Sequence, residues 1–154
     1  MGKRRDGRQA AMQYLFAHDV HGDVSDVERD AFWDLHSASV HVRKHAQTLV
    51  KGILTHQVEI DACITERLEN FRFERLGTVD RNILRLAVFE MLHAPDVPVP
   101  VAINEALEIA KLFGDTQTRS FVNGVLDKIA RSLPGKVEKA EKAAAPTPTP
   151  QPNL

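Results

Sequence analysis

The chain has 154 residues, of which 43% are hydrophobic and 27% are charged, and its formal net charge is −1. This is enough apolar material for one hydrophobic core, but too little to suggest two independent domains. The single cysteine, Cys63, excludes an internal disulfide, and no stretch approaches the roughly 18 apolar residues that a membrane span needs. Five of the first eight residues are charged, and this segment lacks the apolar region of a secretory signal, so we expect a cytoplasmic protein.

Hydrophobic residues recur at helical spacing along most of the chain, which predicts an all-α fold. The first predicted helix spans residues 4–20 and ends near Gly22. Ser25 and Glu28 have the spacing of a capping box, so a second helix should begin there. The apolar positions that we expect this second helix to use are Val27, Ala31 and Leu35.

Three more helices are predicted in the middle of the chain. The third covers residues 42–54 and could be capped by Ser39, and the fourth runs from about 57 to 70 after a bend. The fifth covers residues 79–92 and is apolar on most of its sides. It is therefore predicted to be the central helix of the domain.

Two helices are predicted after the prolines at 95, 98 and 100, which end the fifth. The sixth begins at Pro100 and ends at Gly114, for which we expect a left-handed conformation. The seventh runs from about Thr116 to Leu133, and Gly124 inside it costs roughly 1 kcal/mol relative to alanine, which suggests a close helix crossing there.

The last part of the chain differs from the rest in composition. Residues 134–154 hold charged residues, an alanine run and the alternation PTPTPQP, with too little apolar surface to offset the entropy of ordering. We therefore predict one helical domain over residues 1–133, followed by a disordered tail over residues 134–154.

The sequence gives little indication of a catalytic site or of a metal site. His41 and His45 could share one helix face as metal ligands do, but no third ligand is evident, so we predict no metal site. Cys63 lies between apolar helix positions, where a buried thiol is the ordinary explanation. The sequence contains no glycine-rich phosphate loop and no nucleophile elbow. We therefore expect neither an enzyme nor a cofactor.

Basic residues gather at the start of the chain, where Lys3, Arg4, Arg5 and Arg8 are offset only by Asp6. Positive charge at a helix N-terminus opposes the helix dipole, so another interaction should favour it there. At helical spacing the three guanidinium groups could contact successive phosphates, which predicts binding of single-stranded nucleic acid. A solvated, frayed terminus is the alternative.

A second cluster marks the start of the last helix. Arg119, Phe121 and Asn123 offer a cation, a ring for stacking and an amide, which together could bind a nucleotide. Phe121 could instead belong to the core.

Four segments of the chain, taken in order, resemble the NusB family. They are R-R-x-x-R-x-x-A-x-Q at 4–13, DRNILRLAVFE at 80–90, VAINEALEIAK at 101–111 and FVNGVLDK at 121–128. The resemblance covers roughly residues 3–133 and leaves only the tail outside. It implies a seven-helix domain built as two packed helical subbundles, in a bacterial protein that acts without catalysis.

The resemblance also implies partners. Members of the family bind single-stranded boxA-type RNA together with NusE, a protein of the small ribosomal subunit, and help assemble an antitermination complex on RNA polymerase. This would support transcription of ribosomal RNA. Some members form dimers, so a homodimer remains open.

The site residues can be carried over by position. The RNA contacts implied are those of the arginine-rich N-terminus and of the start of the last helix: Lys3, Arg4, Arg5, Arg8, Arg119, Phe121 and Asn123. The positions that match those facing NusE are Phe16, Glu74 and Asp80.

The chain departs from the family pattern in its basic arm. Asp6, followed by Gly7, stands where the family often has a third consecutive basic residue, so the shorter basic arm predicts weaker RNA binding.

Two alternative functions stay open. The first alternative is a protein-binding helical scaffold whose basic terminus is incidental. The second is a stand-alone relative of the N-terminal domain of RNA cytosine methyltransferases, although the proline-rich segment after Leu133 carries no catalytic cysteine pair.

Overall fold

A computed structural model describes residues 2–36, 39–70 and 72–133 of the chain. Over these ranges the chain forms seven α-helices and one short 3-10 helix, and it forms no β-strand. The predicted all-α class is therefore confirmed, and so is the number of helices. None of the helices in the described ranges is long and apolar enough to cross a membrane. The predicted tail, residues 134–154, lies outside the described residues.

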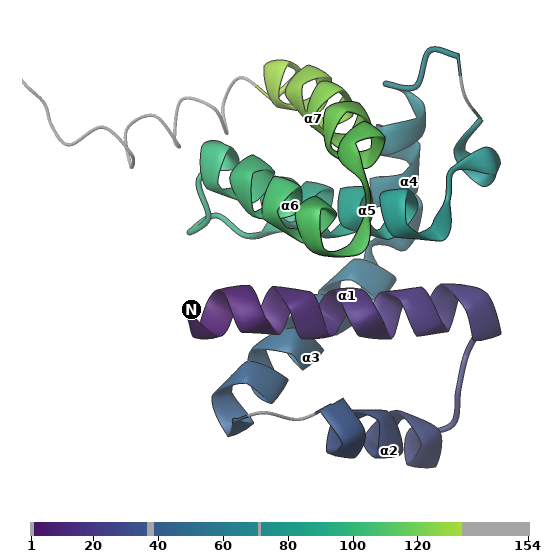
Figure 1. Cartoon of the computed structure of the whole chain (residues 1–154), viewed down its shortest axis with the longest axis vertical. Coiled ribbons are helices and arrows are strands. Elements are labelled where there is room, and N and C mark those ends of the chain that lie inside the picture. Colours follow the sequence, from purple (N-terminus) through teal and green to yellow (C-terminus); the bar gives the residue numbers. More distant parts are fainter. Residues whose placement is uncertain (1, 37–38, 71, 134–154) are drawn as a thin grey trace, which may run out of the picture.

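The helices form two groups, one above the other in Figure 1. The lower group consists of α1 (Lys3–His21), α2 (Asp26–His36) and α3 (Val40–Thr55). The upper group consists of α4 (Gln57–Thr65), the 3-10 helix η1 (Phe73–Arg75), α5 (Thr78–His93), α6 (Val99–Phe113) and α7 (Thr116–Arg131). The chain passes from the lower to the upper group at His56, between α3 and α4.

Helix α5 is the centre of the fold, as predicted. Every residue from Asn82 to Met91 is buried, and α5 contacts α1, α3, α4, α6 and α7. The buried stretch includes three polar residues, Asn82, Arg85 and Glu90, which need polar partners inside the protein.

Ion pairs join α1 of the lower group to α5 of the upper group. Near the start of α1, Arg8 pairs with Glu90 in the C-terminal part of α5. Near the end of α1, Asp19 pairs with Arg81 in the first turns of α5, with Nη2 and Oδ2 2.6 Å apart. The two helices are therefore antiparallel. Because a buried charge without its partner is costly, these pairs favour one register between them.

Helix α2 packs through a different face from the predicted one. Val27 and Leu35 are 78% and 83% exposed, and Ala31 is exposed as well, whereas Trp33 is only 2% exposed. The Trp33 ring stacks on Tyr14 of α1 with centroids 5.3 Å apart and planes 2° apart. An aromatic ring buries more apolar area than an aliphatic side chain, so the rings rather than the aliphatic residues determine the buried face.

Helix ends agree with the predicted positions except in α4. The capping box of α2 is confirmed, because the Ser25 amide donates to Glu28 Oε1 and the Glu28 amide donates to Ser25 Oγ. Helix α4, however, ends at Thr65 and not near residue 70. There the amides of Arg67 and Leu68 bond to carbonyls three residues earlier, which is a tighter turn than an α-helix allows.

Two glycines have other roles than those predicted. Gly114 ends α6 in an extended conformation, with φ −124° and ψ −160°, and not in the left-handed one. A Cβ at Gly114 would lie 2.6 Å from the Thr118 side chain, so close approach explains the glycine. Gly124 is exposed, and a Cβ there would meet no atom within 4 Å, so the predicted close helix crossing is wrong.

Candidate nucleic-acid interface

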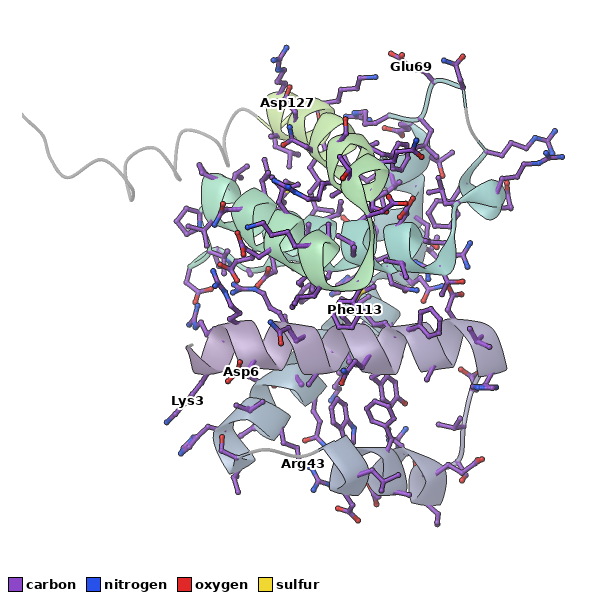
Figure 2. All side chains as sticks on the ribbon, viewed as in Figure 1. Lys3, Asp6, Arg43, Glu69, Phe113 and Asp127 are labelled. Carbon is purple, nitrogen blue, oxygen red and sulfur yellow. The ribbon has the colours of Figure 1, made fainter. Side chains whose placement is uncertain are left out.

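The basic residues of the N-terminus lie in the first two turns of α1, and the first of them face solvent. Lys3 and Arg4 are exposed, and Figure 2 shows Lys3 pointing away from the protein. Arg4 Nη2 donates to Asp96 Oδ2 at 3.0 Å, and both side chains of this pair are largely exposed. Such a surface pair is weak and can give way to a phosphate.

Arg5 is held more firmly by α6. Its Nε and Nη2 donate to the two carboxylate oxygens of Glu105, at 3.0 and 2.7 Å. These hydrogen bonds hold the pKa of Glu105 below its usual value, although partial burial opposes the shift. A guanidinium bound in this two-pronged way has much of its charge satisfied inside the protein.

Arg8 is buried, with only 4% of its surface exposed. Its Nε lies 3.0 Å from both oxygens of Glu90, its Nη2 lies 2.9 Å from Oε2 of the same residue, and its Nη1 lies 3.6 Å from Glu105. Burial raises the pKa of Glu90, and the hydrogen bond from Arg8 offsets this only in part. Arg8 therefore faces the α1–α5 contact, away from any external phosphate.

Gly7 has a packing reason in the structure. It is buried against α3, where a Cβ would come within 2.5 Å of His45 Cδ2. The Nε2 atom of His45 is buried and has no hydrogen-bond partner within the described ranges. Burial lowers the pKa of His45, and Arg8 and Arg4 lower it further, so the ring is neutral at pH 7 and adds no charge to the basic cluster.

The second cluster lies in the first turns of α7. Asp115 caps this helix by accepting from the Thr118 amide at 2.9 Å and from its hydroxyl at 3.1 Å. The hydrogen bond from the Thr118 amide is also the main reason why the pKa of Asp115 is lowered. Arg119 and Asn123 are exposed one turn apart, while Phe121 is partly buried and packs against the core.

Phe121 and Asp80 line the same pocket, together with Arg75 and Gln117. Burial raises the pKa of Asp80, the Thr118 hydroxyl lowers it, and the Asp115 carboxylate raises it. The resemblance assigned Phe121 to RNA and Asp80 to NusE. The structure thus places residues expected to face two partners side by side.

The other two residues expected to face NusE lie on neighbouring elements. Glu74 is exposed on η1, next to Arg75 of the pocket. Phe16 is 43% exposed on α1, one turn before Asp19. The ion pair between Asp19 and Arg81 joins that end of α1 to the start of α5.

The two predicted RNA clusters lie at opposite ends of α6. Arg4 pairs with Asp96, just before α6 begins, whereas Asp115 and Arg119 follow directly after α6 ends. Helix α6 has 15 residues, so it is roughly 22 Å long. Figure 1 shows α6 running from the side of the chain's N-terminus to the loop that leads into α7. One nucleotide cannot reach both clusters, but an extended strand can.

The carboxylates that pair with the arginines were not among the predicted site residues. Both are buried and share a helix face with buried apolar residues, Glu90 with Leu86 and Glu105 with Ala102. An acid on the apolar face of a helix signals a buried ion pair, because an unpaired carboxylate would not remain charged there. That signal was present in the sequence, but it does not reveal which cation is the partner.

Comparisons with known proteins give a consistent result. The sequence model of the NusB family matches residues 5–131. The chain is 42% identical over 144 residues to the transcription antitermination protein NusB of Geotalea daltonii, covering 88% of this chain and 99% of that protein. It is 40% identical over 137 residues to the protein of the same name from Geobacter sulfurreducens, with the same two coverages.

Solved structures are also similar. The structure of T. maritima NusB superposes with a TM-score of 0.76 at 36% identity, covering 90% of this chain and 98% of that one. A NusB crystallised with NusE and double-stranded RNA superposes with a TM-score of 0.76 at 27% identity, covering 86% and 98%.

Proposed function

Since the chain belongs to the NusB family, we propose that it is a transcription antitermination factor that binds boxA-type RNA together with NusE. The observation that carries this proposal is the family match over residues 5–131, which includes both clusters except Lys3 and Arg4. A similar NusB has been crystallised with NusE and RNA, which supports the same pair of partners here. The proposed role is that of an adaptor, with no catalytic step.

In this proposal an RNA strand runs between the two ends of α6. Lys3 and Arg4 would contact phosphates at one end, because they are exposed and weakly paired. At the other end, Arg119 would contact a further phosphate, while Asn123 and the partly exposed ring of Phe121 would hold a base. Arg5 and Arg8 would act mainly by holding α1 on α5 and α6, because their charges are paired with Glu105 and Glu90.

NusE would bind beside the RNA. The partly buried carboxylate of Asp80 lies in the pocket that Phe121 also lines, and its raised pKa would fall again beside a basic side chain of a partner. Phe16 and Glu74 would extend this contact over α1 and η1. Because the pocket touches both proposed surfaces, binding of NusE and binding of RNA would be coupled.

The proposal is tested by measuring binding of a labelled boxA-type RNA, single-stranded and as a duplex, with and without NusE. Phe121→Ala should weaken RNA binding by about 5- to 100-fold, as expected for loss of one stacked base. Arg4→Ala should weaken it by several-fold. The matched control is Arg131→Ala, which removes an exposed arginine at the far end of α7.

Each part of the proposal has an outcome that would contradict it. If Phe121→Ala and Arg4→Ala bind RNA as the control does, the proposed RNA surface is wrong. If the parent chain binds NusE but no RNA of either form, the protein-binding scaffold replaces the proposal. Asp80→Asn should weaken NusE binding while leaving RNA binding measured without NusE unchanged, and equal NusE affinity would remove Asp80 from that surface.

A further inference from the structure

Three side chains with metal-binding atoms meet where the chain passes from the lower to the upper helical group. His56 is the single residue between α3 and α4, Glu59 lies in the first turn of α4, and His93 is the last residue of α5. Spacing along a single helix points only to His41 and His45 as a candidate pair of ligands. His56 and His93 are far apart in the sequence, so only the folded chain brings them together.

The distances between the three residues suit a metal ion. Glu59 Oε1 lies 2.7 Å from His93 Nε2 and 3.7 Å from His56 Nδ1. One ligand atom from each of the three residues lies within 4.8 Å of the others. Around a tetrahedral Zn²⁺ with bonds of about 2.0–2.2 Å, ligand atoms lie roughly 3.3–3.5 Å apart. Movements of about 1 Å, within reach of side-chain rotation, would bring the three atoms to those separations.

Aromatic packing beneath the cluster holds the two histidines in place. The two imidazole rings stack with centroids 3.9 Å apart, and the Phe89 ring lies 6.3 Å from His56 and 5.7 Å from His93. Phe89 in turn packs so closely on Gly52 of α3 that a Cβ there would come within 2.4 Å of its ring. The backbone positions of the two histidines are therefore set by tight packing of α3 on α5, which preorganises the ligands.

We propose that His56, Glu59 and His93 bind a zinc ion. Two imidazoles and one carboxylate are ligands that Zn²⁺ favours, and three protein ligands leave a fourth position for water. The cluster is partly exposed, so an ion can reach it from solvent. An imidazole binds a metal in the plane of its ring, so the stacked rings would have to tilt, and His56 has solvent on one side into which it can turn.

A metal at this place would act on the junction between the two helical groups. It would link the residue at which α3 becomes α4 to the end of α5, in addition to the ion pairs that join α1 to α5. Because zinc would bind the folded chain and not the unfolded one, it would raise thermal stability by mass action. The proposed role is therefore structural, and it does not depend on the RNA or NusE surfaces.

The test is a calorimetric titration of the full, untagged chain with zinc chloride as the only added ligand. We expect one ion per chain with micromolar affinity. His56→Gln and His93→Gln should each weaken binding at least 10-fold, and Glu59→Gln should weaken it by less. His41→Gln is the matched control, because His41 is exposed on α3 and outside the cluster. In NMR spectra, zinc should shift the ring signals of His56 and His93 and leave those of His41 unchanged.

Thermal unfolding provides an independent readout. Zinc at 100 times the parent's dissociation constant should raise the melting temperature of the parent and of His41→Gln by roughly 5–10 °C, and should raise that of His93→Gln by at most about half as much. Without zinc, the variants should melt near the parent, which shows that they fold. Absence of zinc binding by the parent up to millimolar concentration would overturn the proposal, as would equal zinc affinities of the parent and both histidine variants.

Discussion

Arg8 shows how an arginine that the sequence places in a basic cluster can be used inside the protein. It has the same charge as Arg4 and lies one turn further along the same face of α1. Arg4 is nevertheless exposed beside Asp96, while Arg8 is buried against Glu90. The difference comes from α5, which contributes a carboxylate inside its buried stretch. The basic cluster was predictable from the sequence, but its division into exposed and buried members required knowledge of the facing helix.

Arg8→Ala should lower the free energy of unfolding by about 3–5 kcal/mol, because it leaves the buried Glu90 without its partner. Arg4→Ala should change it by less than about 1 kcal/mol, since the Arg4–Asp96 pair is exposed. Urea unfolding measures both values.

A double variant controls for the loss of packing at Arg8. Arg8→Met combined with Glu90→Met removes both charges and should recover much of the lost stability. If Arg8→Ala weakens RNA binding while its urea midpoint stays at the parent value, Arg8 is an RNA contact and not a structural residue.

At the scale of helices, the positions of the elements were more predictable than their faces. The repeat of apolar residues every three to four positions located all seven helices, and the capping box at Ser25 gave the start of α2. The predicted buried face of α2 was wrong because the rings of Trp33 and Phe32 pack against the core in place of the aliphatic residues. The spacing of apolar residues does not show whether the rings or the aliphatic side chains are buried. The end of α4 was missed because the tighter turn after Thr65 has no glycine or proline to mark it.

Gly124 allows a direct test of helix propensity. It lies inside α7, is exposed, and has open space where a Cβ would be. Gly124→Ala should therefore stabilise the protein by roughly 0.5–1 kcal/mol, through the smaller entropy loss of alanine. The measurement is the shift of the thermal midpoint relative to the parent.

The control for Gly124 is a glycine that the fold requires. Gly52→Ala should destabilise the protein, because its Cβ would collide with Phe89. A destabilising effect of Gly124→Ala would mean that the predicted close contact at this position exists after all.

At the scale of the whole molecule, the fold places the first turns of α1 and of α7 at the two ends of one helix, α6. The basic residues of α1 lie at the start of α6, and the first turns of α7 follow its end. Spacing in the sequence could not show that they belong to one surface. The family resemblance supplied that link, and the ion pairs from Arg4 and Arg5 to residues just before and within α6 explain it physically. The His56–Glu59–His93 cluster was equally hidden, since its members become neighbours only after folding.

We propose that the exposed cations on this surface bind RNA phosphates while the buried ones hold the fold together. The most direct test is the salt dependence of boxA-type RNA binding with NusE present. If Lys3, Arg4 and Arg119 each neutralise one phosphate, the logarithm of the binding constant should fall against the logarithm of salt concentration with a slope of roughly −2. Arg4→Ala should reduce the size of the slope by about 0.7. RNA binding that does not change with salt, or a slope that Arg4→Ala leaves unchanged, would contradict the claim.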